Sequence, residues 1–414
     1  MKMLNGDYFW NTLGAVLQSA ISPLLLLVVT RANGIEAAGL FSFAFAVSLL
    51  MWSLAMWGGR TFQVSDAKQQ FNRKSYIMVR LLLAIAVLVI TGVFCLANGY
   101  EAYRTGLIFA LVVFKILESF ADVIHGILQV HDRLYVAGQS LAAKAIIGFV
   151  VFTVVTVLTN DMILASAGVV LVNVVLFAFY DIVQVRKYEQ IWFSGEDIKK
   201  YFVEAGQILW KSAGVFVVFF LTMFSLNIPR YFIDNMRSQE EVGYFGVIAM
   251  PITLLSLLVV FILQPNIVRL SKLYADKKMN EYTATVRKIL LLCLAIGGGV
   301  LLATALVGVP LLRLVFDVDF TEYRTALIVI MAGGVASALL TVYLNHFVIA
   351  RKIAYPLAVL VAANILLTPA SFFAVEQFGV DGGAWAYMFA LVLRLVFVAF
   401  YAKFAKATNE KAVR

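Results

Sequence analysis

One apolar stretch of the chain, residues 105–128, carries a set of ionisable side chains. Their spacing is three, four and three positions, and they are Lys115, Glu118, Asp122 and His125. At about 100° per residue of an α-helix, this spacing places them on one face, within about 80° of one another. A stripe of ionisable groups in a membrane helix indicates either a water-filled path or a network of ion pairs between helices.

Two interpretations of this stripe stay open. In the first, Lys115 attracts an anionic group of a substrate, while Glu118 or Asp122 binds a proton or a cation and couples transport to an ion gradient. In the second, Lys115 pairs with Glu118 and Asp122 pairs with a residue elsewhere, so that the network is structural. A carboxylate one helical turn from a lysine permits both.

Four further basic residues lie inside apolar stretches, and they are Arg80, Lys144, Lys211 and Arg394. If these and Lys115 all faced lipid, the cost would be on the order of 12–18 kcal/mol, as much as or more than the net stability of most proteins. Arg80 and Lys211 lie about one turn from the expected cytoplasmic ends of their helices, where long side chains reach the interface. Lys115, Lys144 and Arg394 are expected near the bilayer midplane, where they would line a polar cavity.

Corresponding helices of the two halves of the chain also carry polar faces. Asn11 and Gln18 share one face of the first apolar stretch, and Lys211 and Ser225 share one face of the seventh. Their pairing predicts that both helices face a common central cavity, although each set alone is typical of hydrogen bonds between membrane helices. The candidate substrate-binding residues are Asn11, Gln18, Arg31, Lys115, Lys144, Lys211, Arg230 and Arg394.

The stretches that hold these residues are predicted to be membrane-spanning helices. The 414 residues are 62% apolar and only 14% charged, with a mean hydropathy of +0.91, which excludes a set of soluble domains. A helix crosses a bilayer with about 20 apolar residues. The runs are continuous and do not alternate, which excludes a β-barrel and makes the fold class all-α. The predicted spans are 8–30, 37–58, 76–97, 105–128, 135–158, 162–184, 207–228, 241–264, 287–308, 323–348, 354–374 and 382–403.

The basic residues report the orientation of these spans. In a soluble protein a net charge of +9 would indicate nucleic-acid binding, but here the charges follow the predicted topology. Of the 33 Lys and Arg residues, 22 lie in the two tails and in the connections after even-numbered spans, and 6 lie on the opposite side. The positive-inside rule therefore predicts that both termini are cytoplasmic, and no nucleic-acid partner is expected.

The chain is predicted to divide into two halves of six spans. An E-x-x-G-x-F pattern begins at Glu36 and recurs at Glu240, at the starts of spans two and eight. Arg31 and Arg230 close the helices that precede the two copies. Because six spans separate the copies, both halves enter the membrane in the same direction and the repeat is parallel. The predicted domains are an N-terminal lobe over 1–190, a cytoplasmic linker over 191–206 and a C-terminal lobe over 207–414.

The linker is predicted to contain a helix of its own. Residues 194–197, Ser-Gly-Glu-Asp, resemble a capping box, so a helix should begin there and run into span seven. The alternative is a short solvated loop.

Motifs of soluble enzymes are missing from the sequence. No G-x-x-x-x-G-K-[ST] motif occurs, so ATP hydrolysis by this chain is not expected. Cys95 and Cys293 lie in separate apolar runs, and the three histidines show no metal-ligand spacing. We therefore expect a protein that is not an enzyme and has no cofactor, with H⁺ or Na⁺ as its coupling ion.

Several stretches spread over the chain match the pattern of one family. They are residues 227–233 (NIPRYFI), 241–245 (EVGYF), Gln264-Pro265 through Leu273-Tyr274, and 310–312 (PLL) with Phe320. The N-terminal part adds Asn11, residues 30–31 (TR) and 39–42 (GLFS). Over essentially its whole length, the chain resembles the polysaccharide flippases of O-antigen or capsule type in the multidrug/oligosaccharidyl-lipid/polysaccharide exporter superfamily.

This resemblance implies an all-α transporter of twelve helices, in two six-helix lobes around a central cavity. It implies a flippase that moves undecaprenyl-pyrophosphate-linked oligosaccharides from the inner to the outer leaflet of the bacterial cytoplasmic membrane by alternating access. The midplane cations would meet the pyrophosphate, and the polar helix faces would meet the sugars. The implied partners are the lipid-linked oligosaccharide, membrane lipid and a polysaccharide polymerase.

Two other classes of protein stay open. A cation-coupled multidrug antiporter of the same superfamily should have a more acidic cavity than five basic residues against Glu118 and Asp122 imply. A membrane polysaccharide polymerase or ligase would need a large outer loop, whereas every outer connection predicted here is short. The lipid II flippases of the superfamily resemble a fourteen-helix plan, which twelve spans do not fit.

Overall fold

The computed structural model describes residues 2–66, 70–193, 198–350 and 354–412, and the regular structure within these ranges is helical without a strand. Eight helices of this part are long and apolar enough to cross a membrane. Two of them, α1 (Lys2–Met56) and α14 (Ala354–Ala412), are interrupted at Gly34 and Gly379, and each contains two predicted spans. Together with α4 (Ala102–Val130) and the pair α9–α10, the helices accommodate all twelve predicted spans. The chain is therefore a multi-pass membrane protein, as the sequence predicts.

The two interruptions depend on glycine. Gly34 has a φ of 88° and Gly379 a φ of 54°, both in the left-handed region that other residues rarely adopt. One glycine thus lets two consecutive spans follow each other with almost no connecting loop.

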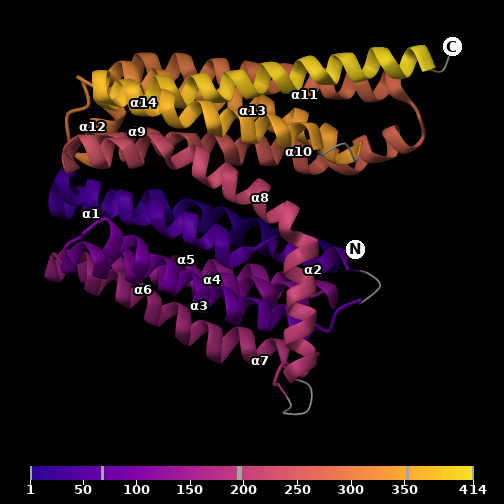
Figure 1. The fold of residues 1–414 in the computed structure, drawn as a ribbon, viewed down its shortest axis with the longest axis horizontal. Coiled ribbons are helices and arrows are strands. Elements are labelled where there is room, and N and C mark those ends of the chain that lie inside the picture. Colours follow the sequence, from indigo (N-terminus) through magenta and orange to yellow (C-terminus); the bar gives the residue numbers. More distant parts are fainter. Residues whose placement is uncertain (1, 67–69, 194–197, 351–353, 413–414) are drawn as a thin grey trace. The chain divides into compact units, whose positions relative to one another are not determined.

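Contacts divide the chain into two compact units, the first ending at Met223 and the second beginning at Phe224. In the first unit, α4 packs against α1, α3 and α6, and α5 packs against α1 and α6 (Figure 1). The α3 helix exposes Ile85, Val89 and Val93 at four-residue spacing, an apolar face suited to lipid. The other elements of this unit are α2 (Gly59–Ser65), α3 (Arg73–Ala97), α5 (Leu134–Thr159), α6 (Met162–Leu176), the π-helix η1 (Phe177–Asp181), α7 (Ile182–Val185) and the first part of α8 (Ile198–Met236).

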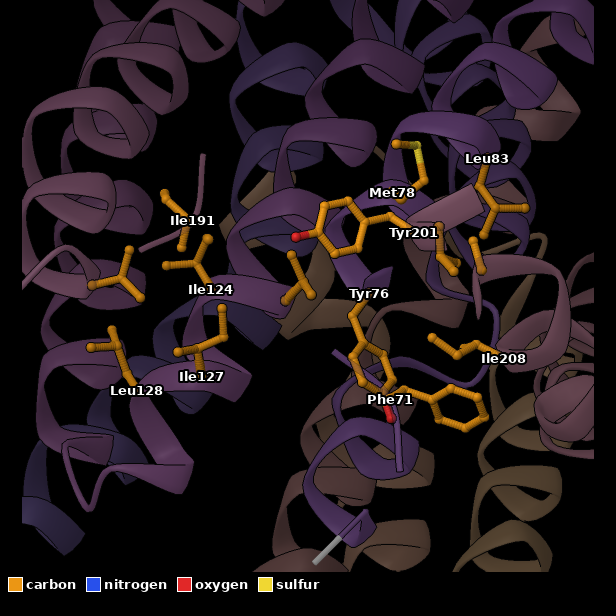
Figure 2. Close-up of a cluster of buried hydrophobic side chains, with 14 of the residues drawn as sticks. Phe71, Tyr76, Met78, Leu83, Ile124, Ile127, Leu128, Ile191, Tyr201 and Ile208 are labelled. Carbon is orange, nitrogen blue, oxygen red and sulfur yellow. The ribbon is translucent and has the colours of Figure 1, made fainter. Parts of the chain in front are cut away.

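The α8 helix belongs to both units, because its first half packs on the N-terminal one. Trp57 stacks on Phe216 with ring centroids 3.8 Å apart, and its indole nitrogen donates to the carbonyl of Leu209 at 2.9 Å. Tyr201 and Ile208 join a buried apolar cluster with residues of α3 and α4, shown in Figure 2. The division by contacts thus differs from the predicted lobe boundary at 207.

The predicted start of the linker helix, residues 194–197, lies outside the described residues. From Ile198 onward the helix is continuous into the seventh predicted span.

In the second unit, α13 (Arg324–Ile349) packs against α10, α11 and α14 and is the most buried of the candidate spans. Separate apolar clusters join α10, α11 and α13 on one side of it and α13 and α14 on the other. The other elements are the rest of α8, α9 (Gln239–Ala249), α10 (Pro251–Ala275), α11 (Met279–Ala303), the π-helix η3 (Thr304–Gly308), α12 (Val309–Phe316) and α14.

The helices α1 and α5 cross so closely at Gly14 and Gly138 that neither position has room for a side chain. A Cβ at Gly138 of α5 would lie 2.3 Å from the backbone carbonyl of Trp10 in α1, and one at Gly14 would lie 2.4 Å from the carbonyl oxygen of Gly138. We expect Gly138→Ala to destabilise the protein by about 1–3 kcal/mol through overpacking. Thermal unfolding of the purified protein in detergent measures this, with Gly214→Ala as control because a Cβ there meets nothing within 4 Å. Equal melting temperatures for the two variants would contradict the crossing described.

Candidate functional site

The predicted stripe on α4 begins with an ion pair inside the helix. The Lys115 ammonium donates to Glu118 Oε2 at 2.8 Å, and the side-chain amide of Gln18 donates to the other oxygen of the same carboxylate. Gln18 lies on α1, so this contact joins the polar face of the first span to the stripe. Both interactions are largely shielded from solvent, since the Lys115 and Glu118 side chains are 7% and 11% exposed.

Aromatic rings surround the Lys115 ammonium on its other sides. Its nitrogen lies 4.7 Å from the ring centroid of Phe114, 5.1 Å from that of Phe45 and 5.8 Å from that of Trp52. Cation–π attraction of this kind strengthens when water is excluded. Lys115 is therefore held by one carboxylate and three rings, and any event that neutralises Glu118 would leave its charge without a matching anion.

Asp122 holds the turn at the end of α1. Its carboxylate accepts a hydrogen bond from the backbone N–H of Arg60 at 3.0 Å and forms an ion pair with Arg80 at 3.6 Å. The Arg80 guanidinium also donates to the carbonyls of Ala55 and Met56, the last residues of α1. Arg80 is only 4% exposed, so its guanidinium lies inside the protein at the end of α1. Its role is to satisfy the terminal carbonyls of α1.

That turn has an uncommon backbone. Three successive residues, Trp57, Gly58 and Gly59, have positive φ angles of 35°, 85° and 54°. A tryptophan in this region is strained and persists only where its surroundings hold it. Here the Arg80–Asp122 pair holds one side of the turn, and the stacking of Trp57 on α8 holds the other.

A second buried cluster forms where α4, α5 and η1 meet. Asp181 is completely buried, lies 3.3 Å from His125 Nε2 and accepts a hydrogen bond from the Lys144 ammonium on its other oxygen. It ends a π-helix, a rare element that often marks functional positions. Asp181 is not among the residues predicted from the sequence, although its position as a carboxylate inside the apolar run 162–184 is a signal that marks it.

Asp181 changes the charge balance inferred from the sequence. In the first unit each deep cation has a carboxylate partner: Lys115 with Glu118, Arg80 with Asp122 and Lys144 with Asp181. The excess of basic over acidic groups expected in a cavity is therefore not seen among these buried residues. The pairs form a network along α4, which we call the α4 ion-pair network.

The remaining candidate substrate-binding residues lie apart from this network. Asn11 is half-buried on α1, two turns from Gln18 on the same face. Lys211 is exposed, with its ammonium 4.7 Å from the ring centroid of Phe71, and Arg31 is exposed. In the second unit, Arg230 donates to the side chain of Asn227 at 3.1 Å, and Arg394 lines a small pocket.

No site for a metal accompanies these pairs. In the described ranges, no group of three His, Cys, Asp or Glu side chains is arranged to hold a metal ion.

Known proteins resemble this chain in sequence and in fold. No family model matches it. A Staphylococcus aureus protein named capsular polysaccharide biosynthesis protein CapF is 24% identical over 376 residues, covering 89% of this chain and 91% of that protein. A multidrug resistance MATE family transporter of the MOP superfamily, in an inward-facing conformation, superposes with a TM-score of 0.74 over 97% of this chain and 99% of that one, at 12% identity. The chain has the MOP fold.

A solved structure of a lipid flippase has the same fold. The lipid II flippase MurJ, in an inward closed conformation, superposes with a TM-score of 0.71 over 95% of this chain and 87% of its own, at 13% identity. The two-lobed, all-helical fold that the sequence predicts is thus confirmed, and the chain shares it with these transporters.

Proposed function

We propose that the chain is a flippase that moves undecaprenyl-pyrophosphate-linked oligosaccharides from the inner to the outer leaflet of the bacterial cytoplasmic membrane. One combination of observations carries the proposal. A protein named for capsular polysaccharide biosynthesis matches 89% of the chain, and the fold is that of a lipid II flippase over 95% of it. Both termini lie in the cytoplasm, as the bias of basic residues favours, and a polysaccharide polymerase is the protein partner.

The α4 ion-pair network would couple this movement to an ion gradient. Protonation of Glu118, or its binding of Na⁺, removes the charge that holds Lys115. The freed ammonium, among rings that exclude water, then favours an arrangement in which it meets a pyrophosphate. Gln18 loses its charged acceptor in the same step, so the event reaches α1 as well. The ion gradient drives export because the outward-facing and inward-facing arrangements of the protein differ in their affinity for the ion.

A cation-coupled multidrug antiporter is the second candidate. Two observations favour it: the fold matches a multidrug transporter with a TM-score of 0.74, and the deep charges of the first unit are balanced by Glu118, Asp122 and Asp181. Because these charges balance, the excess of basic groups that would disfavour an antiporter is not found among them. The name of the curated relative favours the flippase.

Deletion of the gene in a strain that makes the polysaccharide separates the two functions. For a flippase, lipid-linked oligosaccharide should accumulate on the inner leaflet, where a membrane-impermeant lectin detects it in inverted vesicles and misses it in right-side-out vesicles. Expression of the wild-type protein in the deletion strain should abolish the accumulation. The Lys187→Gln variant is the control and should do the same, because Lys187 is exposed and its side chain is bonded only to Gln184 among the described contacts. Normal lipid distribution together with reduced export of cationic drugs would instead establish the antiporter.

A further inference from the structure

A small pocket inside the second unit contains a buried cation. It lies between α8 and α14 and is lined by Ser225, Tyr387, Arg394 and several leucine and alanine side chains. Arg394 is 6% exposed. In the described ranges no carboxylate lies within ion-pairing distance of its guanidinium, in contrast to Arg80, Lys115 and Lys144.

Among the described residues, the buried Arg394 guanidinium has no carboxylate partner, and an anion held in the pocket would neutralise its charge. Arginine keeps its proton in proteins, so the charge cannot be removed by deprotonation. Leaving a charge desolvated without a partner is costly. The leucines and alanines of the pocket cannot offset that cost, and the Tyr387 hydroxyl carries no charge.

The polar groups on the α8 side of the pocket are bonded to one another. The Ser225 hydroxyl donates to Asn364 Oδ1 at 2.8 Å, and Asn364 Nδ2 donates to the carbonyl of Leu360 at 2.9 Å. The Ser225 proton and one lone pair of the Asn364 amide oxygen are therefore engaged with each other and not with Arg394. With a fixed positive charge beside it, the pocket attracts an anion and repels Na⁺.

The size and lining of the pocket select the kind of anion. Its empty volume is about 240 Å³ with the adjoining open solvent included, so the enclosed space lies well below the roughly 300–1,000 Å³ of pockets that enclose drug-sized ligands. An oligosaccharide-bearing headgroup does not fit this space. A mostly apolar wall also disfavours a multiply charged anion such as phosphate, whose desolvation costs more than that of a monovalent ion.

We propose that this pocket is a chloride site, in which Arg394 binds one chloride ion and the ion neutralises the buried charge. The bound ion stabilises the contact between α8 and α14 inside the second unit. The site is separate from the α4 ion-pair network and does not depend on whether the protein carries a lipid-linked oligosaccharide or a drug.

The test uses purified full-length protein in detergent, with chloride exchanged for gluconate at constant ionic strength. The melting temperature of the wild type should rise saturably with chloride and with bromide, and Arg394→Gln should weaken the apparent halide affinity by about tenfold or more. Arg313→Gln removes an exposed arginine of the same unit and should keep the wild-type response.

A second measurement does not require the variant to fold. Bromide soaked into crystals of the wild type should give an anomalous scattering peak beside the Arg394 guanidinium. The proposal fails if the wild type shows no saturable halide effect, if bromide binds elsewhere only, or if pyrophosphate stabilises the protein and chloride does not.

Discussion

Asp181→Asn should remove most of the folded protein. The substitution keeps the shape of the side chain but leaves the Lys144 ammonium buried with no carboxylate, since Lys144 and His125 both contact Asp181. Breaking a buried pair by removing one charge costs about 3–5 kcal/mol, a large part of the ~5–15 kcal/mol that stabilises a typical protein. We expect a large fall in monodisperse protein after detergent extraction, and a lower melting temperature for what remains.

A double variant separates this charge effect from a general packing defect. Lys144→Met removes the partner cation with similar volume, so Asp181→Asn combined with Lys144→Met should recover much of the loss. Lys211→Met serves as the matched control, because that lysine is exposed and should change stability little. If Asp181→Asn alone melts like the wild type, the buried cluster contributes nothing to the fold.

The spans and the α4 stripe were predictable because both are local patterns. Helix periodicity alone places Lys115 and Glu118 one turn apart on one face, and the structure pairs them at 2.8 Å. The run lengths that a bilayer demands likewise predict where helices occur. The fold implied by the resemblance to the exporter superfamily, which rests on loose motifs over the whole chain, is the fold observed.

The partners of the buried charges were not predictable in the same way, because they come from other helices. Asp181 meets Lys144 across 37 positions of sequence, and Asp122 meets Arg80 and the amide of Arg60. A single sequence contains no signal for which helices are neighbours. The position of Arg80 along its own helix suggested a side chain that extends toward the membrane interface. It did not show that the end of α1 lies within reach of Arg80 and supplies carbonyls that need a donor.

The predicted lobe boundary shows the same limitation. Polarity locates the break between halves near residues 185–206, whereas packing assigns the first half of α8 to the N-terminal unit through Trp57 and Phe216. Aromatic stacking between distant segments leaves no periodic trace in the sequence. The division by contacts therefore falls within α8, and the lobe boundary at 207 stays a prediction.

Glu118→Gln should uncouple transport from the ion gradient, and it should lower the melting temperature less than Asp181→Asn does, because three aromatic rings still contact the Lys115 ammonium. Glutamine preserves the length of the side chain and can still accept from Gln18, and the rings of Phe45, Trp52 and Phe114 remain around Lys115. It cannot take up a proton or offer a charged ligand to Na⁺, so the two arrangements of the network no longer differ in ion affinity. In proteoliposomes with lipid-linked oligosaccharide, we expect the acceleration by a proton or sodium gradient to fall by about 5- to 150-fold, the range of ordinary coupling energies.

Asp122→Asn is the informative comparison, because Asp122 lies on the same face but performs a different task. It holds Arg80 and the Trp57–Gly59 turn, so its neutralisation should lower the melting temperature and reduce transport with and without a gradient alike. Glu118→Gln should instead change only the gradient-dependent part of transport, and it should bind substrate at least as tightly as the wild type, because Lys115 is released from its carboxylate. Full gradient dependence in the Glu118→Gln variant would mean that this carboxylate is structural, and coupling would then have to reside in a group outside the α4 ion-pair network.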